Sequence, residues 1–170
     1  AFFVHINGRR AVNEVPEGAY YPAVGKLFRS VPGEEANIGN IYLPLILPGT
    51  LQPVSPDEDV VIGFPEAVVE EHPELEGVSI TVPAGSPFGN EGAEGGRIGI
   101  APVNPDRLPE ETPEGFDFGL VITVQSDGAE NFDVPVAACF PNTEQLPPGA
   151  RSALWSYNHD SGRWEIQGSM

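Results

Sequence analysis

Residues 78–86 read VSITVPAGS, and this stretch decides the class of fold. Val78, Ile80 and Val82 alternate with Ser79 and Thr81. An extended segment with that alternation has one apolar face and one polar face. The Pro-Ala-Gly-Ser sequence that follows is typical of a turn. The stretch therefore predicts a β-strand with one side against a core.

Similar short runs, each closed by turn-forming residues, recur along the chain. Strands are predicted over residues 2–6, 26–31, 38–47, 60–64, 78–82, 97–103, 116–124, 132–140, 153–157 and 163–167. Asn7-Gly8 predicts a hairpin turn after the first strand, and Pro65 predicts one short helix that ends before Pro73. The last two strands flank residues 158–162 and are predicted to form a second hairpin, with Gly162 near its left-handed position. The 20 glycines and 19 prolines among 170 residues exclude a helical bundle, because they interrupt most windows of ten residues.

These runs predict an all-β protein, an antiparallel β-sandwich built from two small β units in tandem. The polar, proline-rich link of residues 48–59 places the boundary, with an N-terminal unit at 1–54 and a second unit at 55–170. The regions around Ile80 and Ile122 are expected to supply core residues. Pro44 marks residues 38–47 as an edge strand or a bulge.

The charge of the chain excludes two classes of partner. Eight basic and 25 acidic residues give a net charge of −17, which opposes unaided binding to nucleic acid or to an anionic membrane. No apolar stretch approaches the ~20 residues that span a bilayer, so no membrane insertion is expected. There is no leader sequence, and because the chain starts at Ala1, we expect a processed product or a piece of a longer one.

The charge is also unevenly distributed. Residues 1–30 carry four basic and two acidic residues, net +2, whereas residues 31–170 carry four basic and 23 acidic residues, net −19. Chance in a short segment is one explanation. The other is a basic end that docks on an acidic body, its own or a neighbour's. High acidity with a single lysine suits an extracellular or cell-surface location.

Residues 78–164 resemble the ZU5-type β-sandwich. The segments that carry the resemblance are VSITVPAGS (78–86), FGLVITVQSDG (118–128), FDVPVAACFPN (132–142) and LPPGARSALWSYNHDSGRWEIQG (146–168). Residues 2–9, 20–35 and 41–46 are similar to segments that follow carboxypeptidase-regulatory-like repeats in large secreted bacterial surface proteins of unknown function. The resemblance implies turns and core positions and carries no site. Some ZU5-type domains cleave themselves at a His-x-Ser step, but His159-Asp160-Ser161 has an acidic middle residue, and we expect no cleavage there.

Oxygen-bearing side chains near Gly128 are the candidates for a metal site. Asp127, Asn131 and Asp133 lie in one turn region and have the ligand type that Ca²⁺ prefers, so Ca²⁺ is a possible ligand. A solvated turn is the alternative, and no other cofactor is expected. The three histidines are far apart in sequence, which argues against zinc.

No pattern of a known catalytic centre occurs in the chain. It lacks Gly-x-Ser-x-Gly, a phosphate-binding glycine loop and His-Glu-x-x-His, so we expect no enzyme. Cys139 is the only cysteine. It is either a buried small apolar residue or half of a bridge to material outside the chain.

The predicted function is that of an extracellular structural module. It would be a subunit of a surface protein or of a homopolymeric fibre, assembled by strand pairing with copies of itself or with adjacent domains of a longer chain. The candidate inter-subunit residues lie at the N-terminus: Phe2, Phe3, Val4, His5, Ile6, Arg9 and Arg10. The alternative is an adhesion module for Ca²⁺ or for a glycan, with Trp155, Tyr157 and Trp164 as a stacking surface, although such aromatics more often serve as core or edge cover.

Overall fold

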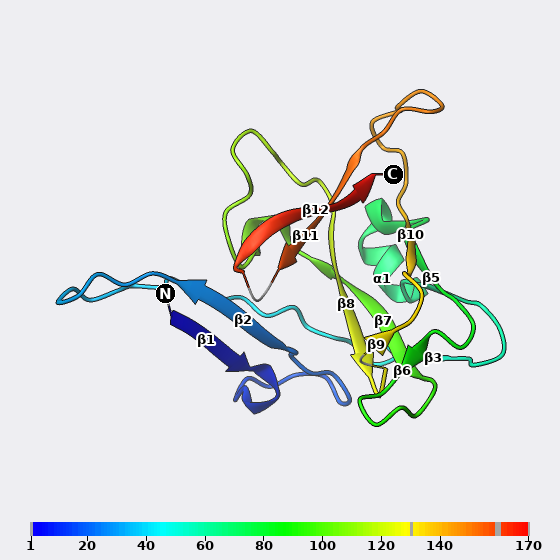
Figure 1. Ribbon diagram of the computed structural model, residues 1–170, viewed down its shortest axis with the longest axis horizontal. Coiled ribbons are helices and arrows are strands. Elements are labelled where there is room, and N and C mark those ends of the chain that lie inside the picture. Colours follow the sequence, from blue (N-terminus) through cyan, green and yellow to red (C-terminus); the bar gives the residue numbers. More distant parts are fainter. Residues whose placement is uncertain (1, 130, 159–160, 170) are drawn as a thin grey trace.

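The computed structural model of the chain describes residues 2–129, 131–158 and 161–169. Strands make up 37% of the structure and helices 9%. The strand pairs in the described part are antiparallel, which confirms the predicted all-β class (Figure 1).

Two three-stranded sheets enclose the core. One has the order β10-β5-β4, and the other has the order β3-β7-β8. Their bounds are β3 Gln52–Val54, β4 Val60–Gly63, β5 Ser79–Val82, β7 Gly96–Val103, β8 Val121–Asp127 and β10 Ala137–Cys139. A single cluster of buried residues from both sheets includes Ile62, Ile80 and Ile98, with Ile122 packed against it. The two regions expected to supply the core therefore do so.

The alternation that predicted β5 is confirmed, and β7 is buried on both of its faces. Ile80 and Val82 are buried, as is Val78 just before the strand, while Ser79 and Thr81 are partly exposed. In β7, Ile98 and Ile100 are buried, but so are Gly99 and Ala101 on the opposite face. A Cβ at Gly99 would overlap the carbonyl oxygen of Thr50. Residues before β3 thus cover the second face of β7.

A separate two-stranded sheet contains β1 (Phe2–Asn7) and β2 (Ala23–Phe28), with Phe2 opposite Phe28 and Asn7 opposite Ala23. The predicted hairpin at Asn7-Gly8 is wrong, because a 3-10 turn, η1 (Gly8–Arg10), follows β1 instead. The Asn7 side chain accepts a hydrogen bond from the Arg9 N–H at 3.1 Å. Such capping stabilises the start of a helical turn and competes with a hairpin.

The C-terminal hairpin has the predicted form. It contains β11 (Ala153–Asn158) and β12 (Arg163–Ser169), and Gly162 has a φ of 64° in its turn. A Cβ at Gly162 would lie 2.6 Å from the Cβ of Leu27 in β2, so the turn packs closely on the N-terminal sheet. The other elements are α1 (Glu66–Glu71), η2 (Pro73–Leu75), β6 (Pro87–Phe88), η3 (Pro105–Arg107) and β9 (Asn131–Phe132).

Four predicted strands differ from the structure, and one of them, predicted over residues 26–31, spans Ala23–Phe28 as β2. Residues 38–47 form no strand, and only Ile46 makes a bridge, to Tyr20. The strand predicted from residue 116 begins at Val121. The run over residues 132–140 is split into β9 and β10 around Pro135, which has no N–H to donate to a ladder. Each of these runs contains the apolar residues that predicted a strand, but no neighbouring strand pairs with its backbone over the full predicted length.

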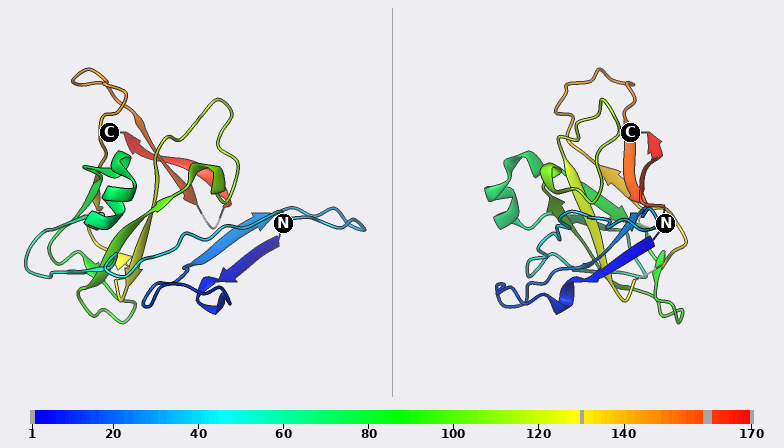
Figure 2. Two further views of the ribbon diagram at one scale, coloured as in Figure 1. Left: turned by 180° about the vertical axis from the view of Figure 1, so that it is seen from behind. Right: turned by 90° about the vertical axis from the view of Figure 1, so that its left-hand side faces the viewer.

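The N-terminal sheet lies toward one end of the longest dimension, and the loop of residues 55–59 lies at the other end (Figures 1 and 2). Strand β3 precedes the boundary expected at residue 55 and pairs with β7 beyond it. Among the described residues, no helix is both long and apolar enough to cross a membrane.

Candidate functional site

The outer edge of β1 is the first candidate site. The sheet has two strands, so β2 takes one edge of β1, and the other edge has no strand partner in the described part of the chain. In Figures 1 and 2, β1 lies on the outside of this sheet. An edge strand presents a row of backbone N–H and C=O groups that another strand can pair with.

The side chains of β1 divide between its two faces. Val4 and Ile6 are partly buried, whereas Phe3 and His5 are exposed. Phe2 and Phe3 keep 57% and 49% of their surface exposed. The Phe2 ring stacks on Phe28 with centroids 5.6 Å apart. The edge is therefore flanked by apolar surface that another chain can cover.

Arg9 and Arg10 follow β1 in η1, and both are exposed. The Arg9 guanidinium lies 4.1 Å from the centre of the Tyr20 ring, a cation–π contact. The basic character predicted for this end thus begins directly at the end of the candidate strand.

The metal candidates lie around β9. Asp127 ends β8, and Asn131 starts β9 and donates from Nδ2 to Oδ1 of Asn90 at 3.0 Å. The Asp133 N–H donates to the carbonyl of Ser86 at 3.1 Å. Within the described residues, no three His, Cys, Asp or Glu side chains gather to hold a metal ion. Calcium binding remains a prediction.

The three aromatic candidates meet in one cluster on the C-terminal hairpin. Tyr157 and Trp164 are edge-to-face with centroids 5.5 Å apart. Phe118 lies 5.0 Å from Trp164 and 6.3 Å from Trp155, and Phe116 lies 5.2 Å from Trp155. The hydroxyl of Tyr157 and Nε1 of Trp164 are buried. This geometry is typical of rings that pack against one another.

Phe116 and Phe118 were not predicted to belong to this cluster. Both fall within the strand predicted over residues 116–124, whereas in the structure they belong to the loop that covers the hairpin. Their alternation in an acidic, proline-rich stretch was the available signal.

Burial of the Tyr157 hydroxyl raises its pKa, and the nearby Glu110 carboxylate raises it further.

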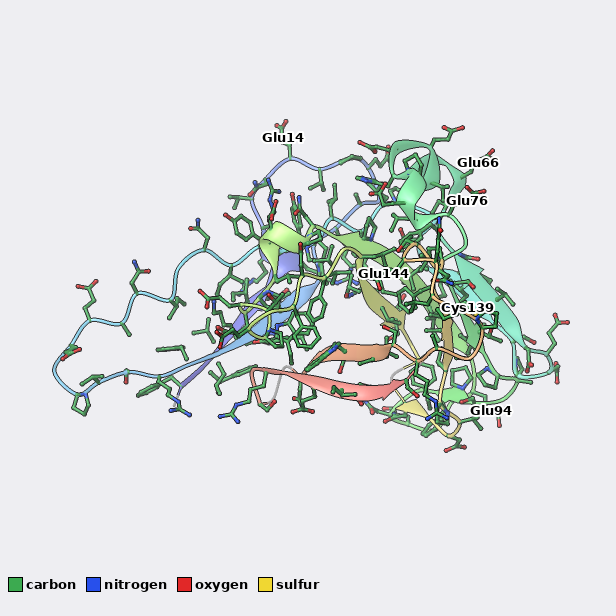
Figure 3. The ribbon with its side chains drawn as sticks, turned by 90° about the horizontal axis from the view of Figure 1, so that it is seen from above. Glu14, Glu66, Glu76, Glu94, Cys139 and Glu144 are labelled. Atoms are coloured by element: carbon green, nitrogen blue, oxygen red, sulfur yellow. The ribbon has the colours of Figure 1, made fainter. Side chains whose placement is uncertain are left out.

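Cys139 lies on β10 and is exposed, so the first of its two alternatives, a buried apolar residue, is wrong, while a bridge to material outside the chain stays a prediction (Figure 3). The alternation explains its position, since Val136, Ala138 and Phe140 pack against the core and leave Ala137 and Cys139 on the outer face. No disulfide forms within the chain. Of the His-x-Ser step, His159 and Asp160 lie outside the described residues.

Comparisons with protein-family models, with curated proteins and with solved structures found no match to this chain.

Proposed function

We propose that this chain is an extracellular structural module whose copies assemble through the outer edge of β1. The observation that supports this most is the open edge itself, a six-residue strand that pairs on one side only in the described part of the chain and is flanked by exposed phenyl rings. Addition of a strand to such an edge gives affinity through main-chain hydrogen bonds.

The charge distribution favours a head-to-tail arrangement. The N-terminal 30 residues have a net charge of +2, and the remainder has −19. Asp57 and Glu58 are exposed on the loop of residues 55–59, at the end of the molecule opposite the N-terminal sheet (Figures 1 and 2). A contact between unlike surfaces that does not close into a ring propagates as a filament. Opposite charges at the two ends would set its direction.

Two neighbouring proline substitutions test the edge. Successive residues of an antiparallel strand direct their N–H groups to alternate edges. Of Val4→Pro and His5→Pro, one therefore removes an N–H at the open edge, and the other removes an N–H that faces β2. The edge-facing variant is expected to lose assembly, as measured by light scattering after size-exclusion chromatography, while its unfolding free energy falls by no more than about 1 kcal/mol.

Val12→Pro is the matched control. Val12 is 98% exposed in a loop, and Ala11 before it has the extended backbone that a residue before proline requires. This variant should assemble like the wild type. Assembly should also weaken at about 1 M salt, where screening reaches ~3 Å. A wild-type chain that stays monomeric up to about 1 mM, below which most specific contacts form, contradicts the proposal.

A further inference from the structure

A cleft of about 390 Å³ lies between the end of β2, residues 37–38, Glu110 and residues 161–163 at the start of β12. Its volume falls in the range of small-ligand sites, about 300–1,000 Å³. Gly162 lies so close to Leu27 of β2 that a Cβ at position 162 would be 2.6 Å from the Leu27 Cβ. The cleft therefore has walls from segments at both ends of the chain.

The charge of the cleft is opposite to that of the molecule. Lys26, Arg29 and Arg163 are three of its ten lining residues, although the whole chain of 170 residues has only eight basic ones. Among the acidic residues that the structure describes, only Glu110 is in this lining. The described lining thus carries a net charge of about +2 inside a protein of net charge −17.

Among the residues that the structure describes, none of these three cations forms an ion pair. Three other arginines are engaged elsewhere, Arg9 on Tyr20, Arg107 on Tyr42 and Arg97 with the Leu51 carbonyl. Arg163 also attracts Glu165, but that carboxylate already accepts hydrogen bonds from Asn158 and Ser161.

We propose that the cleft binds a compact oxyanion with two or more negative charges. Two guanidinium groups can each hold a carboxylate, phosphate or sulfate through paired hydrogen bonds, and the lysine adds a point charge. Asn37 also lines the cleft, and because its Oδ1 accepts from the Gly39 N–H, its Nδ2 group remains as a donor. A dianion balances the net charge of the lining. The remote carboxylates of the body are screened over about 8 Å at physiological salt.

This site needs only one copy, since β2 and the C-terminal hairpin belong to the same chain, although Lys26 and Arg29 also contribute to the positive charge of the first 30 residues. A bound anion would bridge the N-terminal sheet to the hairpin. It would therefore stabilise the contact between Leu27 and Gly162 as well as neutralise the cations.

The test is a titration of the full chain with citrate, pyrophosphate and sulfate, each at an ionic strength held constant with sodium chloride. We expect saturable shifts of the backbone amide resonances of Lys26, Arg29, Gly162 and Arg163, and a rise in melting temperature. Dextran sulfate is a further arm that separates a small ligand from a polymer. The proposal is overturned if none of the three small anions saturates, if the shifts map elsewhere, or if only the polymer binds.

Two double variants remove the same charge from different places. Arg29→Gln with Arg163→Gln should weaken anion binding by about tenfold or more, because it removes charge-assisted hydrogen bonds. Arg107→Gln with Arg151→Gln, at exposed positions outside the cleft lining, should change it by about twofold or less. Lys26→Gln provides an independent cleft variant, and melting without ligand verifies that each variant folds. Equal weakening in the two double variants overturns the site.

Discussion

The two three-stranded sheets and the N-terminal sheet use the same kind of strand in opposite ways. Ile62, Ile80 and Ile98 are at most 2% exposed, because each sheet covers the other. Phe2 and Phe3 are about half exposed, because the β1–β2 sheet has a single layer. A two-stranded sheet is marginal by itself. The comparison teaches that apolar alternation predicts a strand, while the neighbouring layers decide whether it stabilises the fold or remains available for contact.

The N-terminal sheet contacts the rest of the chain outside the two three-stranded sheets. Tyr20, just before β2, exchanges backbone hydrogen bonds of 3.0 and 2.8 Å with Ile46, and Gly162 of the C-terminal hairpin packs on Leu27 of β2. We therefore expect core substitutions to act on the whole molecule and substitutions at these contacts to act mainly on the N-terminal sheet.

The largest expected effect is at Ile62 in β4. Ile62→Ala removes a fully buried side chain and leaves a cavity between the sheets, which should lower the unfolding free energy by about 3–4 kcal/mol. Val61→Ala is the control from the same strand, since Val61 is 65% exposed, and it should cost about 1 kcal/mol or less. Urea unfolding measures both. Equal losses would mean that the sheets do not enclose a core as described.

The next effect is expected where the C-terminal hairpin contacts the N-terminal sheet. Gly162→Ala places a Cβ 2.6 Å from Leu27 and also strains a backbone with positive φ, which should together cost about 2–4 kcal/mol. Gly149→Ala is the control, because its φ is 84° but nothing lies within 4 Å of the new Cβ, so only about 1–2 kcal/mol of backbone strain applies.

Hydrogen exchange distinguishes where Gly162→Ala acts. The amides of β1 and β2 should exchange faster in this variant, while those of β5 and β7 change less. Uniform acceleration across all four strands would contradict a local contact and would instead make the hairpin turn part of one cooperative core.

A smaller effect is expected in the aromatic cluster. Phe118→Ala removes the ring between Trp155 and Trp164 and should cost about 1–2 kcal/mol, because the ring is only partly buried. Tryptophan fluorescence should shift to the red as the indoles gain solvent. Phe132→Ala, whose ring belongs to β9, should leave the fluorescence unchanged. An unshifted emission in Phe118→Ala would contradict the packing of this loop on the hairpin.

The sequence predicted those features that depend on one short segment. The alternation at residues 78–82 and the C-terminal hairpin with its glycine turn needed only local pattern. Residues 38–47 were equally apolar, but they form no ladder, and nothing local indicates whether a partner strand is present. At Asn7-Gly8, a side-chain cap took the place of a hairpin turn.

The candidate sites follow the same division. Strand β1 was predictable from its own residues. Which of its edges stays unpaired depends on the side on which β2 pairs with it, and the residues of β1 do not determine that side. The cleft cations Lys26, Arg29 and Arg163 come from opposite ends of the chain, and the fold alone brings them together. The uneven charge along the sequence indicated a basic end, but it could not indicate that Arg163 joins it.

The smallest effect concerns Glu165 in β12, close to the Gly162 contact with the N-terminal sheet. Hydrogen bonds from Asn158 and from Ser161, at 3.0 and 2.8 Å, lower the pKa of this carboxyl, with a further contribution from Arg163. Because the folded pKa is below the unfolded one, the stabilisation is present above about pH 4.3 and is lost as the pH falls through the lowered pKa. Ser161→Ala should therefore raise the pKa of Glu165, as measured by carbon NMR of the carboxyl. The stability difference between wild type and variant should be larger at pH 7 than in acid. Ser152→Ala, before β11, should leave this titration unchanged, and an unaltered Glu165 titration in Ser161→Ala would show that the turn hydroxyl does not hold the carboxylate.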